Sequence, residues 1–180
     1  MASRFSTGAL SAVLALAAAS PLACSATQRP DGGKGLLPVG SVAPDFAAKD
    51  AAGNVVRLSS ATGSPRVVYF YPKDETPGCT KEACAFRDAF ADYEAKGVAV
   101  FGVSRDSEAS HEEFRKHHSL PFALAADENG VIQAAYGVPS KFGKHAARVT
   151  FLVGKDGRVT YVFEDVDPAT HAKDVLAKVP

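Results

Sequence analysis

Hydrophobic positions along the chain fall into short blocks separated by polar stretches, and these blocks predict the strands of a sheet. Three mainly apolar runs, at 67–71, 98–103 and 148–153, predict buried strands, because strands covered on both faces lack an alternating polar position. An N-terminal β-hairpin is predicted over 45–58, with its turn at 51–54. The chain is therefore expected to contain a sheet whose central strands are covered on both sides.

Helix signals lie between and after these strands. The remaining predicted elements, in chain order, are a helix from 77 to about 96 ended by Gly97, a polar helix at 107–118 capped by Ser107 or Asp106, a strand at 122–125, a helix at 128–136 ended by Gly137, a strand at 159–163, and a closing helix capped by Asp167. Alternating strands and helices followed by a terminal hairpin and helix predict an α/β sandwich with a central mixed β-sheet flanked by helices. That order suits a thioredoxin-like fold.

The first 26 residues differ in composition from the rest of the chain. Arg4 is their only charged residue, and an apolar run at 8–19 predicts a secretory leader that is too short for a comfortable membrane span. Residues 21–24 resemble the lipobox of bacterial lipoproteins, in which the cysteine, here Cys24, is lipidated. Cleavage after Ala26 is the alternative. We therefore divide the chain into a leader (1–26), a flexible tether (27–39) and one folded domain (40–180).

Charge and cysteine content narrow the function. The chain has 20 basic and 20 acidic residues, so no electrostatic partner such as nucleic acid is expected. Loss or lipidation of Cys24 leaves only Cys79 and Cys84 in the folded domain, and they can pair only with each other. A purely structural disulfide is disfavoured, because closing so short a loop constrains the unfolded chain little.

The segment 69–84 combines an apolar run, a turn and the start of a helix that carries both of these cysteines. Thr76 followed by Pro77 predicts a helix N-terminus, with a hydroxyl N-cap before a first-turn proline. Cys79 is therefore expected in the first helical turn, where free backbone N–H groups and the helix dipole favour a thiolate. Since the thiolate is the reactive form of cysteine, Cys79 is the candidate nucleophile.

The same segment resembles the active site of the peroxiredoxins. Their pattern Pro-x-x-x-Thr-x-x-Cys is present as Pro72, Thr76 and Cys79. The longer pattern Thr-Pro-Gly-Cys-Thr-x-Glu-Ala-Cys, typical of the bacterioferritin comigratory protein or peroxiredoxin Q group, ends at Cys84. Later blocks of that group are matched in order at 102–107, 118–122, 135–138 and 148–153. The resemblance covers roughly 39–179 and implies a thioredoxin-like (peroxiredoxin) fold.

By this resemblance the protein is expected to be a thioredoxin-dependent peroxidase without a cofactor or a metal. Cys79 would attack hydrogen peroxide or an organic hydroperoxide and become a sulfenic acid, which Cys84 would resolve as a disulfide. Thr76 and Arg148 would contact the thiolate and the peroxide, while Pro72 would shape the pocket and shield the sulfur from water. The expected partners are a peroxide and a thioredoxin-like reductant, and the expected state is an exported monomer, periplasmic or held at the membrane by a lipid on Cys24.

Several of these residues have simpler interpretations. Thr76 is compatible with plain N-capping, Arg148 with a solvated charge opening a strand, and Pro72 with a strand terminator. A second function class is an exported copper-delivery or redox-sensing protein of the same broad fold, with Cys79, Cys84 and a histidine as soft ligands.

Histidines also occur on the polar helix predicted at 107–118. For His111, His117 and His118, a solvated helix face is favoured over a metal site.

Overall fold

The structure, a computed structural model, describes residues 28–141 and 143–180. The predicted leader and Cys24 lie outside the described residues. The strands are β1 (Ala47–Lys49), β2 (Val55–Arg57), β3 (Arg66–Phe70), β4 (Ala99–Ser104), β5 (Ala123–Ala126), β6 (Ser140–Lys141), β7 (His145–Ala146), β8 (Val149–Val153) and β9 (Val159–Phe163). The helices are the 3-10 turn η1 (Leu58–Ala61), α1 (Pro77–Asp88), α2 (Phe90–Ala95), α3 (Glu108–His118), α4 (Val131–Ala135) and α5 (His171–Leu176).

Seven of the strands form one mixed sheet in the order β2-β1-β5-β4-β3-β8-β9. Its centre is parallel, with β3 beside β4 and β4 beside β5, and β8 and β9 extend it antiparallel on one side. The N-terminal hairpin of β1 and β2 joins the opposite side through an antiparallel contact with β5. The predicted α/β class, mixed sheet and N-terminal hairpin are thus confirmed.

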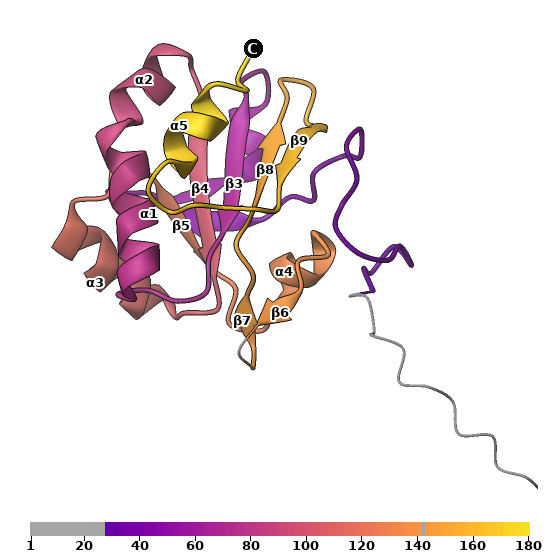
Figure 1. The fold of residues 1–180 in the computed structure, drawn as a ribbon, viewed down its shortest axis with the longest axis horizontal. Coiled ribbons are helices and arrows are strands. Elements are labelled where there is room, and N and C mark those ends of the chain that lie inside the picture. Colours follow the sequence, from indigo (N-terminus) through magenta and orange to yellow (C-terminus); the bar gives the residue numbers. More distant parts are fainter. Residues whose placement is uncertain (1–27, 142) are drawn as a thin grey trace, which may run out of the picture.

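The two faces of β3 belong to two different hydrophobic clusters. Val67 and Tyr69 pack with buried residues of α1, α2, α3 and α5, whereas Val68 and Phe70 pack with Tyr136 beside α4 and with the N-terminal segment. Figure 1 shows α1 and α5 on one side of the sheet and α4 on the other. All five residues of β3 are buried, as expected for a strand covered on both faces. This fully buried strand leads directly into the segment that carries the cysteines.

The segment predicted as a flexible tether is instead folded against the domain over its described part. Leu37 is 4% exposed, and its N–H donates to the carbonyl of Tyr136. The guanidinium of Arg29 donates to the carbonyl of Gly35. Gly137 faces that carbonyl so closely that a Cβ would lie 1.9 Å from its oxygen, and its φ of +67° favours glycine as well. The tether prediction failed here because composition does not reveal these contacts with distant residues.

Three helix predictions need correction. The single helix expected from 77 to 96 is divided at Ala89, whose ψ of 2° leaves the helical range, into α1 and α2. The change of direction places Tyr93 in the core, where its hydroxyl donates to the carbonyl of Ala172. The closing helix begins at His171 with Thr170 as its N-cap, because the Asp167 side chain and carbonyl accept bonds from a preceding turn. The helix predicted at 128–136 is α4, which begins only after Gly130.

Other helix boundaries agree with the sequence. Ser107 caps α3, its hydroxyl accepting from the N–H of Ser110. Among the described residues, no helix is both long and apolar enough to cross a membrane.

Candidate active site

Cys79 lies in the first turn of α1, as the sequence predicts. β3 ends at Phe70, and a loop leads to Thr76, which has extended backbone angles and occupies the N-cap position before Pro77. Thr76 accepts a hydrogen bond at its carbonyl from the N–H of Thr80, which closes the first turn around the cysteine. The side chain of Cys79 is buried, with 1% of the residue exposed. The thiol therefore faces the protein interior at the positive end of a helix.

The hydroxyl of Thr76 is used differently from plain capping. It donates to the carbonyl of Lys73 at 2.9 Å, and α1 has no side-chain bond at its N-cap. A hydroxyl that donates to a carbonyl keeps its oxygen as an acceptor. The simple capping interpretation is thus wrong, and the oxygen of Thr76 remains able to accept a hydrogen bond from another molecule.

Arg148 brings a positive charge to the sulfur. Its Nη2 donates to Cys79 Sγ at 3.2 Å, and its Nη1 donates to a carboxylate oxygen of Glu82. Gly78 makes this approach feasible, because a Cβ at that position would lie 2.8 Å from Arg148 Nη2. The side chain of Arg148 is only 21% exposed, so the interpretation as a solvated charge is wrong.

Glu82 is the member of the site whose role sequence reasoning missed. It lies one turn after Cys79 on the same face of α1 and is 1% exposed. Burial raises its pKa to about 7, against the opposing influence of the Arg148 charge. The usable signal was a glutamate placed three residues after the cysteine on an otherwise apolar helix face.

His171 of α5 completes this buried group. Its Nε2 lies 3.9 Å from Glu82 Oε1 and 2.8 Å from the hydroxyl of Thr150. Burial lowers the pKa of His171 to about 4, so its imidazole is neutral at pH 7. Arg148 is therefore the positive charge that acts on both Glu82 and Cys79.

Pro72 and Arg148 line one surface cleft, which has a volume of about 310 Å³. Lys141, Ala147 and residues 164–166 complete its lining. The cleft is lined by the residue whose guanidinium contacts Cys79, so a small molecule in it would lie beside Arg148. Pro72 thus lies at the site, beyond the end of β3.

Cys84 lies on the same continuous helix as Cys79. Among the described residues both are free thiols, Cys79 buried and Cys84 half-buried. A separation of five residues on a regular helix places them roughly 7.5 Å apart along the axis and about 140° apart around it. Bridged cysteines need Cα atoms within about 7 Å and side chains that point toward each other. The folded helix is therefore incompatible with a disulfide between them.

A buried polar network holds the loop before α1. Asp74, 3% exposed, accepts hydrogen bonds from the hydroxyls of Tyr71 and Ser110 at 2.7 Å and contacts His111 Nδ1 at 2.8 Å. Burial acts to raise the pKa of Asp74, but the contact with His111 and the other hydrogen bonds outweigh it and leave the pKa lowered. His111 is fully buried, so a solvated position is wrong for this histidine. The network joins the end of β3 to α3.

Comparisons with known proteins agree with this site. The model of the AhpC/TSA family matches residues 39–162. Peroxiredoxin Q, chloroplastic, of Oryza sativa subsp. japonica is 42% identical over 174 residues, covering 96% of this chain and 80% of the relative.

Solved structures of related proteins show the same similarity to peroxiredoxins. The peroxidoxin BcpB of Mycobacterium tuberculosis is similar with a TM-score of 0.72 and 32% identity, covering 79% of this chain and 96% of that one. The bacterioferritin comigratory protein of Xanthomonas campestris is similar with a TM-score of 0.68 and 33% identity, covering 74% of this chain and 89% of that one. The fold is therefore the thioredoxin-like peroxiredoxin fold, and the chain belongs to the AhpC/TSA family, in its peroxiredoxin Q and bacterioferritin comigratory protein group.

Proposed function

We propose that Cys79 is the peroxidatic cysteine, and Cys84 the resolving cysteine, of this thiol-dependent peroxidase. The observation that carries the assignment is the contact of Arg148 Nη2 with Cys79 Sγ at 3.2 Å in the first turn of α1. The positive charge of a guanidinium favours the negative form of a thiol beside it, whereas burial opposes that form.

In the first step the thiolate of Cys79 attacks one oxygen of the peroxide. The S–O bond forms as the O–O bond breaks, and the departing oxygen takes a proton and leaves as water or an alcohol. Cys79 is thereby oxidised to a sulfenic acid while the peroxide is reduced. Arg148 and the acceptor oxygen of Thr76 are the groups we assign to hold the peroxide, with Pro72 at the rim of the cleft.

Ionisation alone is too small an effect to explain such a catalyst. A free cysteine of pKa near 8.5 is about 3% ionised at pH 7, so complete ionisation gains at most roughly 30-fold. The remaining rate must come from positioning the peroxide and stabilising the charge that develops on the leaving oxygen. Arg148 is suited to this because its fork of donors contacts Cys79 and the residue also lines the cleft.

In the second step the thiolate of Cys84 attacks the sulfenic sulfur. The S–S bond forms as the S–O bond breaks, and the departing hydroxide takes a proton and leaves as water. A thioredoxin-like dithiol then reduces this disulfide and becomes oxidised itself, which returns both cysteines to thiols. Because the two cysteines sit on one helix, the first part of α1 has to unwind between them in each cycle.

The substrates we propose are hydrogen peroxide and organic hydroperoxides. The related Xanthomonas campestris protein is described as having alkyl peroxide reduction activity, which supports the second class. We further propose that the protein acts as a monomer.

The alternative of a copper carrier using the two cysteines is not favoured. Within the described residues, neither Cys79 nor Cys84 belongs to a group of three convergent metal ligands. Two thiols about 140° apart around one helix also point away from a shared ion.

The two serine variants test the assignment. Cys79→Ser should abolish peroxide consumption with thioredoxin and thioredoxin reductase. Cys84→Ser should still consume about one equivalent of peroxide per chain but should lose turnover with thioredoxin. Normal turnover in Cys79→Ser would overturn the proposal, and normal recycling in Cys84→Ser would show that Cys84 is not the obligatory resolving cysteine.

For the leader, we propose export with a lipid anchor on Cys24, which lies outside the described residues. The support is the lipobox-like sequence at 21–24. Expression in a bacterial host with radiolabelled palmitate should label the wild type and not Cys24→Ala. An unlabelled wild type would favour a soluble exported protein instead.

A further inference from the structure

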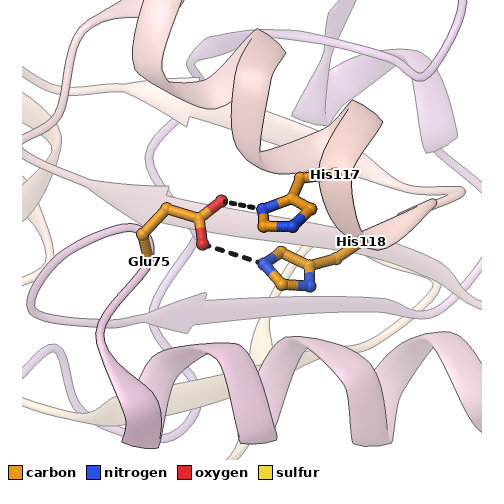
Figure 2. Close-up of side chains that lie close together, drawn as sticks. All are labelled: Glu75, His117 and His118. Atoms are coloured by element: carbon orange, nitrogen blue, oxygen red, sulfur yellow. Dashed lines mark hydrogen bonds and ion pairs between the residues drawn. The ribbon is translucent and has the colours of Figure 1, made fainter.

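Glu75, His117 and His118 bring three metal-ligating groups together beside the active-site helix. Glu75 Oε1 lies 3.1 Å from His117 Nδ1, and Glu75 Oε2 lies 3.0 Å from His118 Nε2. One ligand atom from each of the three residues lies within 4.8 Å of the other two. Figure 2 shows the carboxylate pointing toward both imidazole rings, each ring meeting a different oxygen. The cluster is separate from the thiol and guanidinium of the peroxidase site.

The three residues come from two elements that are far apart in the sequence. Glu75 directly precedes Thr76, the N-cap of α1, while the histidines are the last two residues of α3. Glu75 has a φ of +57°, a conformation that non-glycine residues adopt rarely and at a cost. The surrounding fold thus holds Glu75 in an uncommon geometry at the point where the ligands meet.

The types and spacing of these ligands fit a zinc-like ion. Two imidazoles and one carboxylate form a common three-residue ligand set for Zn²⁺, with a water in the fourth position. At metal–ligand distances of 2.0–2.1 Å, ligand atoms of a tetrahedral ion lie about 3.4 Å apart. The N–O distances of 3.1 and 3.0 Å join each nitrogen to a different carboxylate oxygen. One ligand atom from each residue lies within 4.8 Å of the other two, so the three side chains would close in slightly around an ion. Both ring nitrogens of histidine can coordinate, so binding through Nδ1 of His117 and Nε2 of His118 is chemically ordinary.

The cluster is also accessible to an ion. The side chains of His117 and Glu75 are 72% and 46% exposed, whereas that of His118 is 16% exposed. The ring of His118 packs edge-on against Phe114 at 5.1 Å, which limits its motion. One ligand is therefore held by packing, and the other two can adjust to an arriving ion.

We propose that Glu75, His117 and His118 form a binding site for one divalent transition-metal ion of the zinc class. The ion takes the place of the direct contacts between the carboxylate and the two imidazoles, and it links the loop before α1 to the C-terminal end of α3. This replaces the expectation that His117 and His118 only form a solvated helix face. The proposal concerns residues other than the two cysteines and does not depend on the peroxidase assignment.

Cobalt(II) titration of the reduced full chain, carrying no histidine tag, tests the site. Co²⁺ replaces Zn²⁺ in such sites and absorbs visible light, and coordinated thiolate adds an intense near-ultraviolet band that imidazole and carboxylate do not. We expect saturation at one Co²⁺ per chain, visible bands without the thiolate band, and displacement of Co²⁺ by Zn²⁺. His117→Ala should lower the affinity by at least about tenfold, since losing even an indirect partner of a metal commonly costs that much.

Matched controls separate this site from general metal binding. His145→Ala removes a histidine outside the cluster, and Glu112→Gln neutralises an exposed carboxylate on α3, so both should bind Co²⁺ as the wild type does. Glu75→Gln should weaken binding as His117→Ala does. Because His117 is largely exposed, its variant should keep the wild-type circular dichroism spectrum.

Wild-type affinity in both His117→Ala and Glu75→Gln would overturn the proposal. A spectrum dominated by the thiolate band in the wild type would also overturn it, because the ion would then be held by cysteine.

Discussion

Replacing Glu82 with Gln should change how the stability of the fold depends on pH. The carboxyl of Glu82 is 1% exposed and faces Arg148 and His171. Its pKa is raised from 4.5 to about 7, mainly by burial. The folded state therefore holds a proton on Glu82 between these two pH values, where the unfolded chain has released it. By linkage, the wild type loses stability as pH rises through this window.

The size of the effect follows from the shift. The pKa of Glu82 rises from 4.5 in the unfolded chain to about 7 in the folded protein. The free energy of unfolding is therefore about 3 kcal/mol larger at a pH where Glu82 is protonated in both states than at a pH where it is ionised in both. Between pH 5 and pH 8, the part that is lost is about 2.5 kcal/mol, because some ionisation of the unfolded state precedes pH 5. His171 acts in the opposite direction: its pKa is lowered to about 4 by burial, so it adds stability as pH rises from about 4 to 6.5.

Urea unfolding of the reduced wild type and of Glu82→Gln, at intervals from pH 5 to pH 8, measures this contribution. The stability difference, wild type minus variant, should fall by about 2.5 kcal/mol across the range, because the His171 contribution cancels in the subtraction. The guanidinium of Arg148 stays protonated throughout, so its lost partner adds only a constant offset. A difference that stays flat from pH 5 to pH 8 would refute the reasoning and would mean that Glu82 is already ionised at pH 5.

Two further predictions concern the catalytic cycle. Arg148→Lys keeps the charge but loses the fork that contacts Cys79 and Glu82 together, so the second-order rate of Cys79 oxidation, followed by stopped flow, should fall by about two powers of ten. An unchanged rate of Cys79 oxidation would mean that Arg148 takes no part in the reaction with peroxide. Because Cys79 and Cys84 share one helix, amide exchange over 80–86 should be faster in the oxidised protein than in the reduced one, with β3 and β4 little changed. Equal protection of that segment in both redox states would exclude local unwinding.

The parts of the fold that sequence predicts well are those with a local signal. The strands β3, β4 and β8 agree with the predicted apolar runs to within one residue at each end, because buried strands are continuous in hydrophobicity. Cys79 in the first turn of α1 also follows from a local pattern, the hydroxyl and proline that open the helix. In these cases the residues within the segment itself were enough to predict its structure.

The features that sequence missed depend on contacts between distant residues. Glu82 is polar on an apolar helix face, and only its contact with Arg148, 66 positions away, explains it. His111 lies on a charged helix but is buried against Asp74, 37 positions away. The division at Ala89 is hidden as well, because the hydrophobic pattern continues through it while tertiary packing changes the direction of the chain. Helix propensity and hydrophobic periodicity are properties of neighbouring residues, so they do not reveal contacts between residues this far apart in the sequence.

The network around Asp74 has a consequence for the fate of oxidised Cys79. It fixes the chain before α1 to Tyr71, Ser110 and His111, while Phe86 fixes the later part of α1 by stacking on Tyr69 at 4.7 Å. The segment that unwinds between these anchors is short, and the entropic cost of closing a loop grows with its length. Cys84 is thereby kept at a high effective concentration near the sulfenic acid. A second peroxide that would carry Cys79 to the irreversible sulfinic acid must compete with this nearby thiol, so the anchors that position the active site also protect it from its own substrate.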